Sequence, residues 1–207
     1  MLACLDLEGV LVPEIWIAFA EKTGIEKLRL TTRDVPDYHR LMRGRLEILD
    51  ANGLKLPDIQ EVIRGIAPLS GAREFLQWLK SEFQVIILSD TFYEFAGPLM
   101  AQLDYPTLFC NSLVVGEDGR ILDYQLRQDD GKTKAVQALK QLNFQVIAAG
   151  DSYNDTGMLN LADAGILFRP PENVIREFPQ FPVTKTFEEL REAFSSGRES
   201  ISAASRK

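Results

Sequence analysis

Short runs of apolar residues alternate along this chain with stretches whose apolar residues recur at helical spacing. The apolar runs predict strands that are buried in a sheet. We expect these strands at residues 3–7, 84–89, 145–149 and 164–168. Helices are expected at residues 71–83, 92–103, 132–142, 157–161 and 171–178. Strands that alternate with helices predict an α/β fold, in which a parallel sheet carries helices on both faces.

One segment departs from this alternation. Residues 14–66 contain no convincing strand, and apolar residues such as Leu41, Leu46 and Leu49 recur there at helical spacing. Pro36 and Asp37 are typical of a helix start, and Asn52 with Gly53 is typical of a helix end. We therefore predict a small helical insert at residues 13–68, within an α/β core formed by residues 1–12 and 69–207.

Two further segments have their own signals. Residues 108–127 hold two extended runs on either side of a Glu-Asp-Gly-Arg sequence, which predicts a β-hairpin. Residues 196–207 are rich in Ser, Gly and Arg, and we expect them to form a flexible tail.

The composition limits the partners that the chain can bind. The 207 residues carry a net charge of −7, which disfavours nucleic acid and anionic membrane surfaces but allows an anionic substrate beside a bound cation. No segment approaches the ~18 apolar residues of a transmembrane helix. Cys4 and Cys110 lack metal-ligand spacing, and Cys4 lies within an apolar run. We expect a reduced, cytoplasmic protein with no nucleic-acid or membrane partner.

Acidic residues follow two of the predicted strands. Asp6 and Glu8 end the first, and Gly9 allows the backbone to turn sharply after them. Asp151 and Asp155 follow the third strand and begin the next helix. Ligands of parallel sheets bind beyond the carboxyl ends of the strands, and a set of carboxylate oxygens there suits Mg²⁺. Helix capping is the alternative for the second pair, but it leaves the first pair unexplained.

A hydroxyl segment and a lysine complete the candidate site. Ser89, Asp90 and Thr91 end the second strand, where a hydroxyl and the amides of the next helix start could bind phosphate. Helix capping would explain the same three residues taken alone. Lys132 is our first choice for the cation that holds a phosphate dianion, and Lys134 is its competitor. Either lysine could instead be a solvated helix residue.

Taken in chain order, these four pieces resemble the motifs of the haloacid dehalogenase-type phosphatase superfamily. The resemblance covers nearly the whole chain. It implies a Rossmann-like three-layer α/β/α core, with the helical insert as a cap over the active site. It also implies that Asp6 is the nucleophile that forms an aspartyl-phosphate, and that Glu8 is the general acid.

The resemblance assigns roles to the remaining site residues. The phosphoryl oxygens would be held by Lys132 and by Ser89, which lies in the segment with Asp90 and Thr91. Mg²⁺ would be held by Asp6, the backbone carbonyl of Glu8 and Asp151, with Asp155 in or beside its ligand shell. Asn154 would orient the phosphoryl group or Ser89.

The predicted cap also carries family-like residues. Tyr38 precedes Arg45 at the spacing at which phosphoserine phosphatases place an aromatic residue before a substrate-binding arginine, so Arg45 would pair with a substrate carboxylate. Glu14 would meet the substrate ammonium, although it lies one residue away from the family's position. The alternatives are a surface arginine and a glutamate at a helix N-terminus. His39, the one histidine, is expected on the surface.

Glu8 stands where the superfamily usually has Asp. Residues 4–16, 88–95 and 148–156 resemble the bifunctional phosphoserine phosphatase/homoserine phosphotransferase group, whose members carry Glu there. The resemblance implies a Mg²⁺-dependent hydrolase that acts on phosphoserine, a small phosphorylated amino acid, with transfer to homoserine as a second activity. Alternatives are a phosphatase of another small phosphomonoester and a non-catalytic phosphoryl-binding module. The sequence does not decide whether the protein forms a homodimer.

Overall fold

The computed structural model describes residues 1–31, 34–35 and 37–204; Pro36, at the predicted helix start, lies outside these ranges. One sheet contains seven strands of the described residues in the order β4-β3-β2-β1-β5-β6-β7. The strands are β1 (Leu2–Leu5), β2 (Gln84–Phe92), β3 (Thr107–Val115), β4 (Ile121–Gln125), β5 (Val146–Gly150), β6 (Ala164–Phe168) and β7 (Val183–Thr184). All neighbours pair in parallel except β3 and β4, which are antiparallel.

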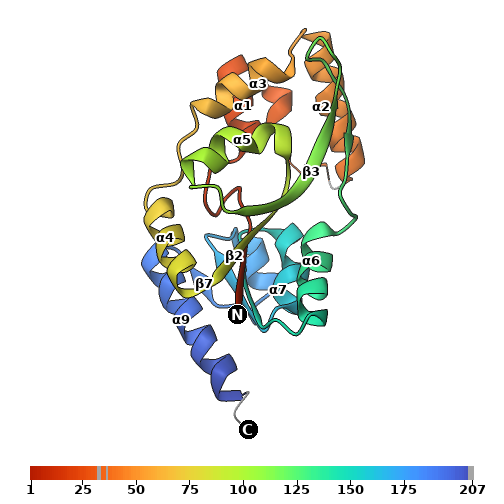
Figure 1. Ribbon diagram of the computed structural model, residues 1–207. Helices are drawn as coiled ribbons and strands as arrows, with labels where there is room; N and C mark the ends of the chain where they lie inside the picture. Colours follow the sequence, from red (N-terminus) through yellow and green to blue (C-terminus); the bar gives the residue numbers. More distant parts are fainter. Residues whose placement is uncertain (32–33, 36, 205–207) are drawn as a thin grey trace.

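Helices cover both faces of the sheet, as the strand pattern predicts (Figure 1). Ala3 and Leu5 of β1 belong to the hydrophobic cluster that includes α4 (Ala72–Glu82) and α9 (Phe187–Ala204). Leu2 and Cys4 belong to a second cluster with α6 (Gly131–Gln141), α7 (Thr156–Leu161) and α8 (Glu172–Glu177). Alternate residues of a strand point to opposite faces, so a strand between two helical layers must be apolar throughout. The α/β/α architecture is confirmed.

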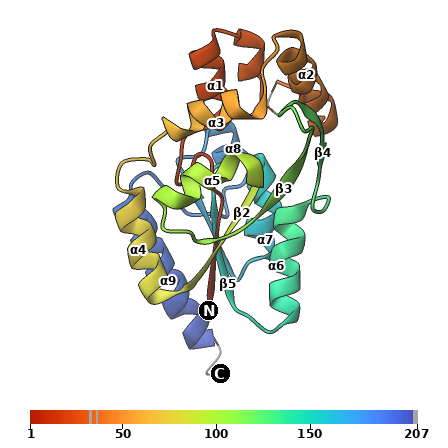
Figure 2. The same cartoon turned by 45° about the horizontal axis from the view of Figure 1, so that its top comes forward.

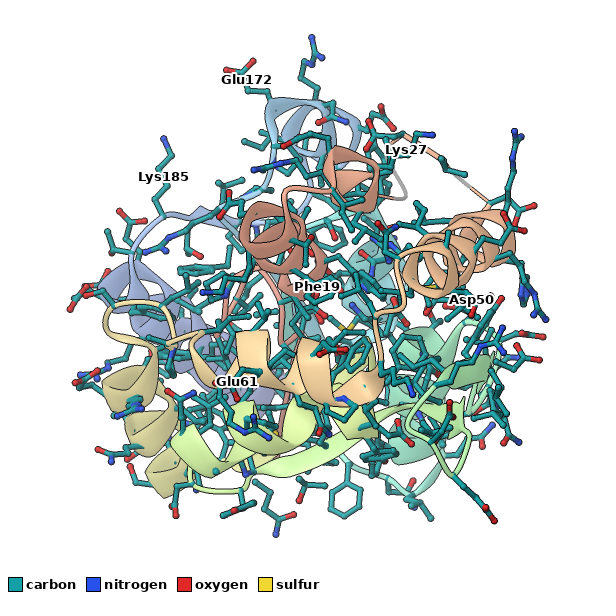
Figure 3. The ribbon with its side chains drawn as sticks, turned by 90° about the horizontal axis from the view of Figure 1, so that it is seen from above. Phe19, Lys27, Asp50, Glu61, Glu172 and Lys185 are labelled. Atoms are coloured by element: carbon teal, nitrogen blue, oxygen red, sulfur yellow. The ribbon has the colours of Figure 1, made fainter. Side chains whose placement is uncertain are left out.

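The helical insert lies beyond the carboxyl ends of the strands (Figures 1 and 2). It consists of α1 (Ile15–Thr23), the 3₁₀ helix η1 (Glu26–Arg29), α2 (Tyr38–Ala51) and α3 (Leu56–Arg64). Its two ends meet where the backbone N–H of Leu69 donates to the carbonyl of Leu11 (2.9 Å). Seen from above, Phe19 lies centrally and is fully buried, whereas Lys27 and Asp50 lie nearer the rim and are exposed (Figure 3). The insert thus buries apolar side chains above the sheet.

Most predicted boundaries agree with the structure to within a few residues. The side chain of Asp37 accepts a hydrogen bond from the backbone N–H of Arg40 (3.1 Å) and caps α2, which ends before Asn52 as predicted. The strand predicted to end at Ser89 instead continues as β2 to Phe92, with a register shift after Leu88. Helix α5 (Tyr93–Gln102) begins only after it, so the amides near Ser89 are not those of a helix start.

The predicted hairpin is confirmed by the antiparallel pairing of β3 and β4. It rises beside α2 in Figure 1, and its turn reaches the insert, where the N–H of Leu56 donates to the carbonyl of Gly119 (2.9 Å). Among the described residues, no helix is both long and apolar enough to cross a membrane.

The flexible tail predicted at residues 196–207 is wrong as far as Ala204, because these residues continue α9. Phe187, Leu190 and Phe194 are buried at helical spacing, and Phe194 packs edge-on against Phe83. Arg198 then pairs with Glu82 of α4 (2.5 Å). The apolar stripe that anchors this helix lies mostly before the Ser-rich segment, so the local composition concealed it.

Candidate active site

Three buried carboxylates converge at the carboxyl ends of β1 and β5. Asp6, Asp151 and Asp155 each offer an oxygen, and these oxygens lie within 4.8 Å of one another. The strands are parallel neighbours, with Leu5 beside Ala149, so the residues that follow them emerge together. Gly9 (φ +79°) passes so close that a Cβ there would lie 2.6 Å from the Asp151 carboxyl group. The predicted acidic cluster therefore forms, and its all-oxygen donors fit a divalent cation such as Mg²⁺.

Lys132, from the first turn of α6, is the cation inside this cluster. Its Nζ lies 2.7 Å from Asp155 Oδ1 and 3.0 Å from Asp6 Oδ1, and its side chain is 4% exposed. Burial lowers the pKa of Lys132, but Asp155, Asp6 and Asp90 outweigh it and hold the pKa well above its usual value. The surrounding carboxylates thus favour the positively charged form of Lys132. The structure places it, rather than the half-buried Lys134, among the carboxylates.

The surroundings of Asp6 disfavour the ionised form of its carboxyl group. Burial raises its pKa well above the usual value, repulsion from Asp155 adds to this, and Lys132 offsets part of it. Its Oδ1 also accepts a hydrogen bond from the N–H of Leu7 (2.7 Å). A further cation would favour the ionised, nucleophilic form, since opposite charge stabilises a buried carboxylate.

Asp155 caps a helix with one carboxylate oxygen and binds Lys132 with the other. Its Oδ2 accepts hydrogen bonds from the N–H groups of Asp151 (2.9 Å) and Ser152 (3.0 Å), which caps the 3₁₀ helix η2 (Tyr153–Asp155). Its Oδ1 holds Lys132. Both oxygens are engaged, which favours a place beside a metal over direct ligation.

The segment at the end of β2 faces the same cluster. Asp90 Oδ2 accepts a hydrogen bond from Asn154 Nδ2 (2.8 Å) and lies 3.8 Å from Lys132 Nζ. Ser89 is buried, and its Oγ accepts a hydrogen bond from the N–H of Thr91 (3.2 Å). The helix-capping alternative for these residues is not realised, because Phe92 stands before α5 and makes no side-chain cap.

Asn111 is a site residue that sequence reasoning missed. Its Nδ2 donates to the carbonyl of Asp90 (3.1 Å), and its Oδ1 accepts from the N–H of Arg127 (3.0 Å). It thereby ties the end of β2 to the loop that leads to Lys132. Tyr38, from the insert, donates to the same Asp90 carbonyl (3.3 Å). A lone buried asparagine within an apolar strand was the available signal.

Glu8 lies apart from the other carboxylates and faces the insert. Its Oε2 accepts a hydrogen bond from the N–H of Ile15, at the start of α1 (2.8 Å). Burial raises the pKa of Glu8 to about 8, and repulsion from Glu14 contributes, although Arg45 and the Ile15 bond lower it. The raised pKa favours the protonated form of Glu8, which is the form that a general acid needs.

The two predicted recognition residues of the insert lie near Glu8. Glu14 occupies the N-cap position of α1, but its side chain makes no capping hydrogen bond. Arg45 is 8% exposed, so the surface alternative is wrong, and its Nη2 donates to the carbonyl of Leu30 (2.7 Å). His39 is exposed, as predicted, and its Nδ1 lies 2.5 Å from the Tyr124 hydroxyl.

Comparison with known proteins agrees with this geometry. Residues 1–163 match the family model of haloacid dehalogenase-like hydrolases. The chain belongs to the haloacid dehalogenase-like hydrolase family. A phosphoserine phosphatase of Pseudomonas syringae pv. tomato is 64% identical to this haloacid dehalogenase-like hydrolase over 202 residues, which cover 97% of this chain and 85% of the relative. Phosphoserine phosphatase ThrH of Pseudomonas aeruginosa is 65% identical over 193 residues, covering 93% of this chain and 94% of the relative.

Solved structures show the same fold for this hydrolase. A phospho-aspartyl intermediate analogue of a phosphoserine phosphatase superposes with a TM-score of 0.73 at 20% identity, covering 92% of this chain and 97% of that one. A substrate-bound phosphoserine phosphatase complex gives a TM-score of 0.73 at 21% identity, with coverages of 94% and 97%.

Proposed function

We propose that this haloacid dehalogenase-like hydrolase is a Mg²⁺-dependent phosphoserine phosphatase. The observation that carries the proposal is the buried contact of Asp6 with Lys132 (3.0 Å), two residues before Glu8, a carboxyl group whose pKa is raised by burial. The nucleophile and the proton donor would thus come from the segment after β1, and the phosphate-binding cation from the first turn of α6. The two relatives above 60% identity, both named phosphoserine phosphatase, support the substrate.

The residues present fit a magnesium ion. Asp6 and Asp151 would hold it with the Glu8 backbone carbonyl, and Asp155 would orient Asp151 and Lys132 from the edge of the ligand shell. When bound, Mg²⁺ would neutralise phosphoryl charge and favour ionised Asp6. Gly9 supports this placement, because any side chain there would displace the Asp151 carboxylate.

The proposed reaction has two steps. In the first, a carboxylate oxygen of Asp6 attacks phosphorus, the bond between phosphorus and the serine oxygen breaks, and that oxygen takes the proton of Glu8. In the second, Glu8 takes a proton from water, which attacks the aspartyl-phosphate and releases inorganic phosphate with restoration of Asp6. Lys132 and Ser89 hold the phosphoryl oxygens throughout.

We further propose that residues 13–68 form the cap that recognises the leaving group. Arg45 would bind the substrate carboxylate, and Glu14 would bind the ammonium. Both influence the pKa of Glu8, which supports their position on the site side of the insert. The Tyr38 contact with Asp90 joins the cap to the proposed phosphate-binding segment.

Transfer of the phosphoryl group to homoserine is a second proposed activity. An amino-alcohol held by the same cap could replace water in the second step and lose its proton to Glu8. The similarity to ThrH supports this activity.

Two buried free cysteines are in keeping with our proposal of a reducing, cytoplasmic location.

Phosphate release from phosphoserine, with and without Mg²⁺, tests the main proposal. We expect Mg²⁺-dependent release by the wild type and none by Asp6→Asn, with Asp123→Asn as a distant charge control. Phosphorus NMR with added homoserine then distinguishes inorganic phosphate from O-phosphohomoserine. Faster release from other small phosphomonoesters than from phosphoserine would favour a different substrate, and no release from any of them would favour a binding module.

A further inference from the structure

The guanidinium of Arg45 lies over an aromatic ring. Its guanidinium carbon lies 4.4 Å from the centre of the Trp16 ring. The other contacts are the hydrogen bond to the Leu30 carbonyl and a long contact from Nη1 to the sulfur of Met42 (3.6 Å). Trp16 therefore helps to fix the guanidinium, because a single hydrogen bond to a carbonyl still allows the group to rotate about that bond.

Trp16 is itself firmly placed. It lies on α1, is 8% exposed, and packs edge-on against Phe19 of the same helix (6.3 Å) and Phe95 of α5 (5.7 Å). The ring thus bridges the insert and the α/β core. It presents its face to Arg45 of α2, so it links the orientation of the guanidinium to three helices.

Arg45 also retains an unused donor. Its Nε is buried and has no hydrogen-bond partner among the residues that the structure describes. A buried donor without a partner is costly, and guanidinium N–H groups match a carboxylate as a planar, two-pronged fork. Because Nη1 and Nη2 already contact Met42 and Leu30, the Nε–H group is the donor that is left for such a fork, together with the second N–H of the neighbouring Nη2.

We propose that Trp16 is a positioning residue that fixes the guanidinium plane of Arg45 for the substrate carboxylate. This inference rests on the proposed function, since it requires a substrate with a carboxylate. The indole face attracts the guanidinium charge and restricts its rotation. Less conformational entropy is then lost when the N–H groups bind the incoming carboxylate. Trp16 itself need not touch the substrate.

The first test compares two substrates that differ in the carboxylate alone. Phosphoserine and phosphoethanolamine share the phosphate and the ammonium group. Trp16→Leu should lower kcat/KM for phosphoserine by about tenfold, mainly through KM, and should change that for phosphoethanolamine by less than about twofold. Trp16→Phe keeps an aromatic ring that attracts a cation less strongly than indole does, so its kcat/KM for phosphoserine should lie between those of Trp16→Leu and the wild type. Equal losses for the two substrates would overturn the inference.

A double-mutant cycle with Arg45→Met separates positioning from general packing. If Trp16 acts through Arg45, Trp16→Leu should cause almost no further loss of phosphoserine turnover in the Arg45→Met background. Additive losses would contradict the inference. Thermal unfolding checks that each variant is folded, and Trp16→Phe takes the place of Trp16→Leu in the cycle if the latter does not fold.

The outcome also distinguishes this inference from the proposed function. If the wild type fails to hydrolyse phosphoserine, the proposed function fails before any variant is made. If the wild type hydrolyses it and Arg45→Met impairs phosphoserine selectively, the function stands. Additive Trp16 losses would then reject the positioning role alone.

Discussion

Ion pairs occur in two contrasting regions of this hydrolase. In the site, Lys132 pairs with Asp6 and Asp155, and none of these side chains is more than 7% exposed. Where the hairpin lies against the insert, ion pairs also join the two elements, but their side chains are 43–61% exposed. The latter pairs are Arg43–Asp123, Lys55–Asp118 and Arg120–Asp50.

The contrast shows that charge pairing has different consequences in the two regions. Exposed pairs typically contribute 0 to about 1 kcal/mol, because water already solvates both partners. Buried pairs lose that solvation, so removing one partner leaves an uncompensated charge, at a typical cost of about 3–5 kcal/mol. The buried cluster is therefore costly to break, whereas the exposed pairs join the hairpin to α2 and to the start of α3 at little energetic consequence.

The largest expected effect comes from removing the nucleophile of the buried cluster. Asp6→Asn keeps the size of the side chain but cannot form an aspartyl-phosphate, so phosphoserine turnover should fall by at least about 10³-fold. Asp123→Asn, the same change in the exposed region, should keep turnover within about twofold, as expected for a partly solvated pair. Phosphate release measures both, and substantial activity in Asp6→Asn would rule out the mechanism.

Lys132→Met tests the energetics of the buried region directly. It leaves Asp6 and Asp155 without their cation, so the free energy of unfolding should fall by about 3–5 kcal/mol, and turnover should be lost. Lys134→Met, two residues along the same helix, should change the free energy of unfolding by less than about 0.5 kcal/mol. Urea denaturation compares the two variants. Similar values would contradict the distinction between buried and exposed charge.

The buried cluster was largely predictable from the sequence because its position follows from topology. Asp6 and Asp151 follow apolar strands, and parallel strands bring their carboxyl ends to one edge. The choice between Lys132 and Lys134 was not predictable. It depends on how α6 is rotated about its axis, and hence on packing between elements distant in sequence.

Other features depended on contacts that local patterns do not encode. Trp16 looks like an ordinary core aromatic until α2 places Arg45 over its ring. Asn111 carries no motif, and its function comes from two backbone groups on other segments. The end of α9 looked like a tail because its composition is polar, but buried residues earlier in the same helix fix it.

Metal binding should stabilise the buried region without affecting the exposed one. A ligand that binds only the native state raises the free energy of unfolding by about 2.7 kcal/mol at a hundredfold excess over Kd. Mg²⁺ should therefore raise the melting temperature of the wild type by several degrees, and that of Asp123→Asn equally. Asp151→Asn should lose most of this shift. If thermal unfolding shows the full shift in Asp151→Asn, Asp151 is not a ligand of the metal.

The smallest expected effects lie in the exposed region. Arg43→Gln and Asp123→Asn should each lower the free energy of unfolding by less than about 1 kcal/mol, and their coupling in a double-mutant cycle should be about 0.2–1 kcal/mol. Raising the salt concentration to about 1 M reduces the Debye length to about 3 Å and should abolish most of that coupling. The same salt should leave the destabilisation by Lys132→Met nearly unchanged, because buried pairs are screened much less. A coupling between Arg43 and Asp123 that exceeds 2 kcal/mol and resists salt would show that the hairpin holds the insert by a desolvated contact, and the two regions would then differ in chemistry but not in strength.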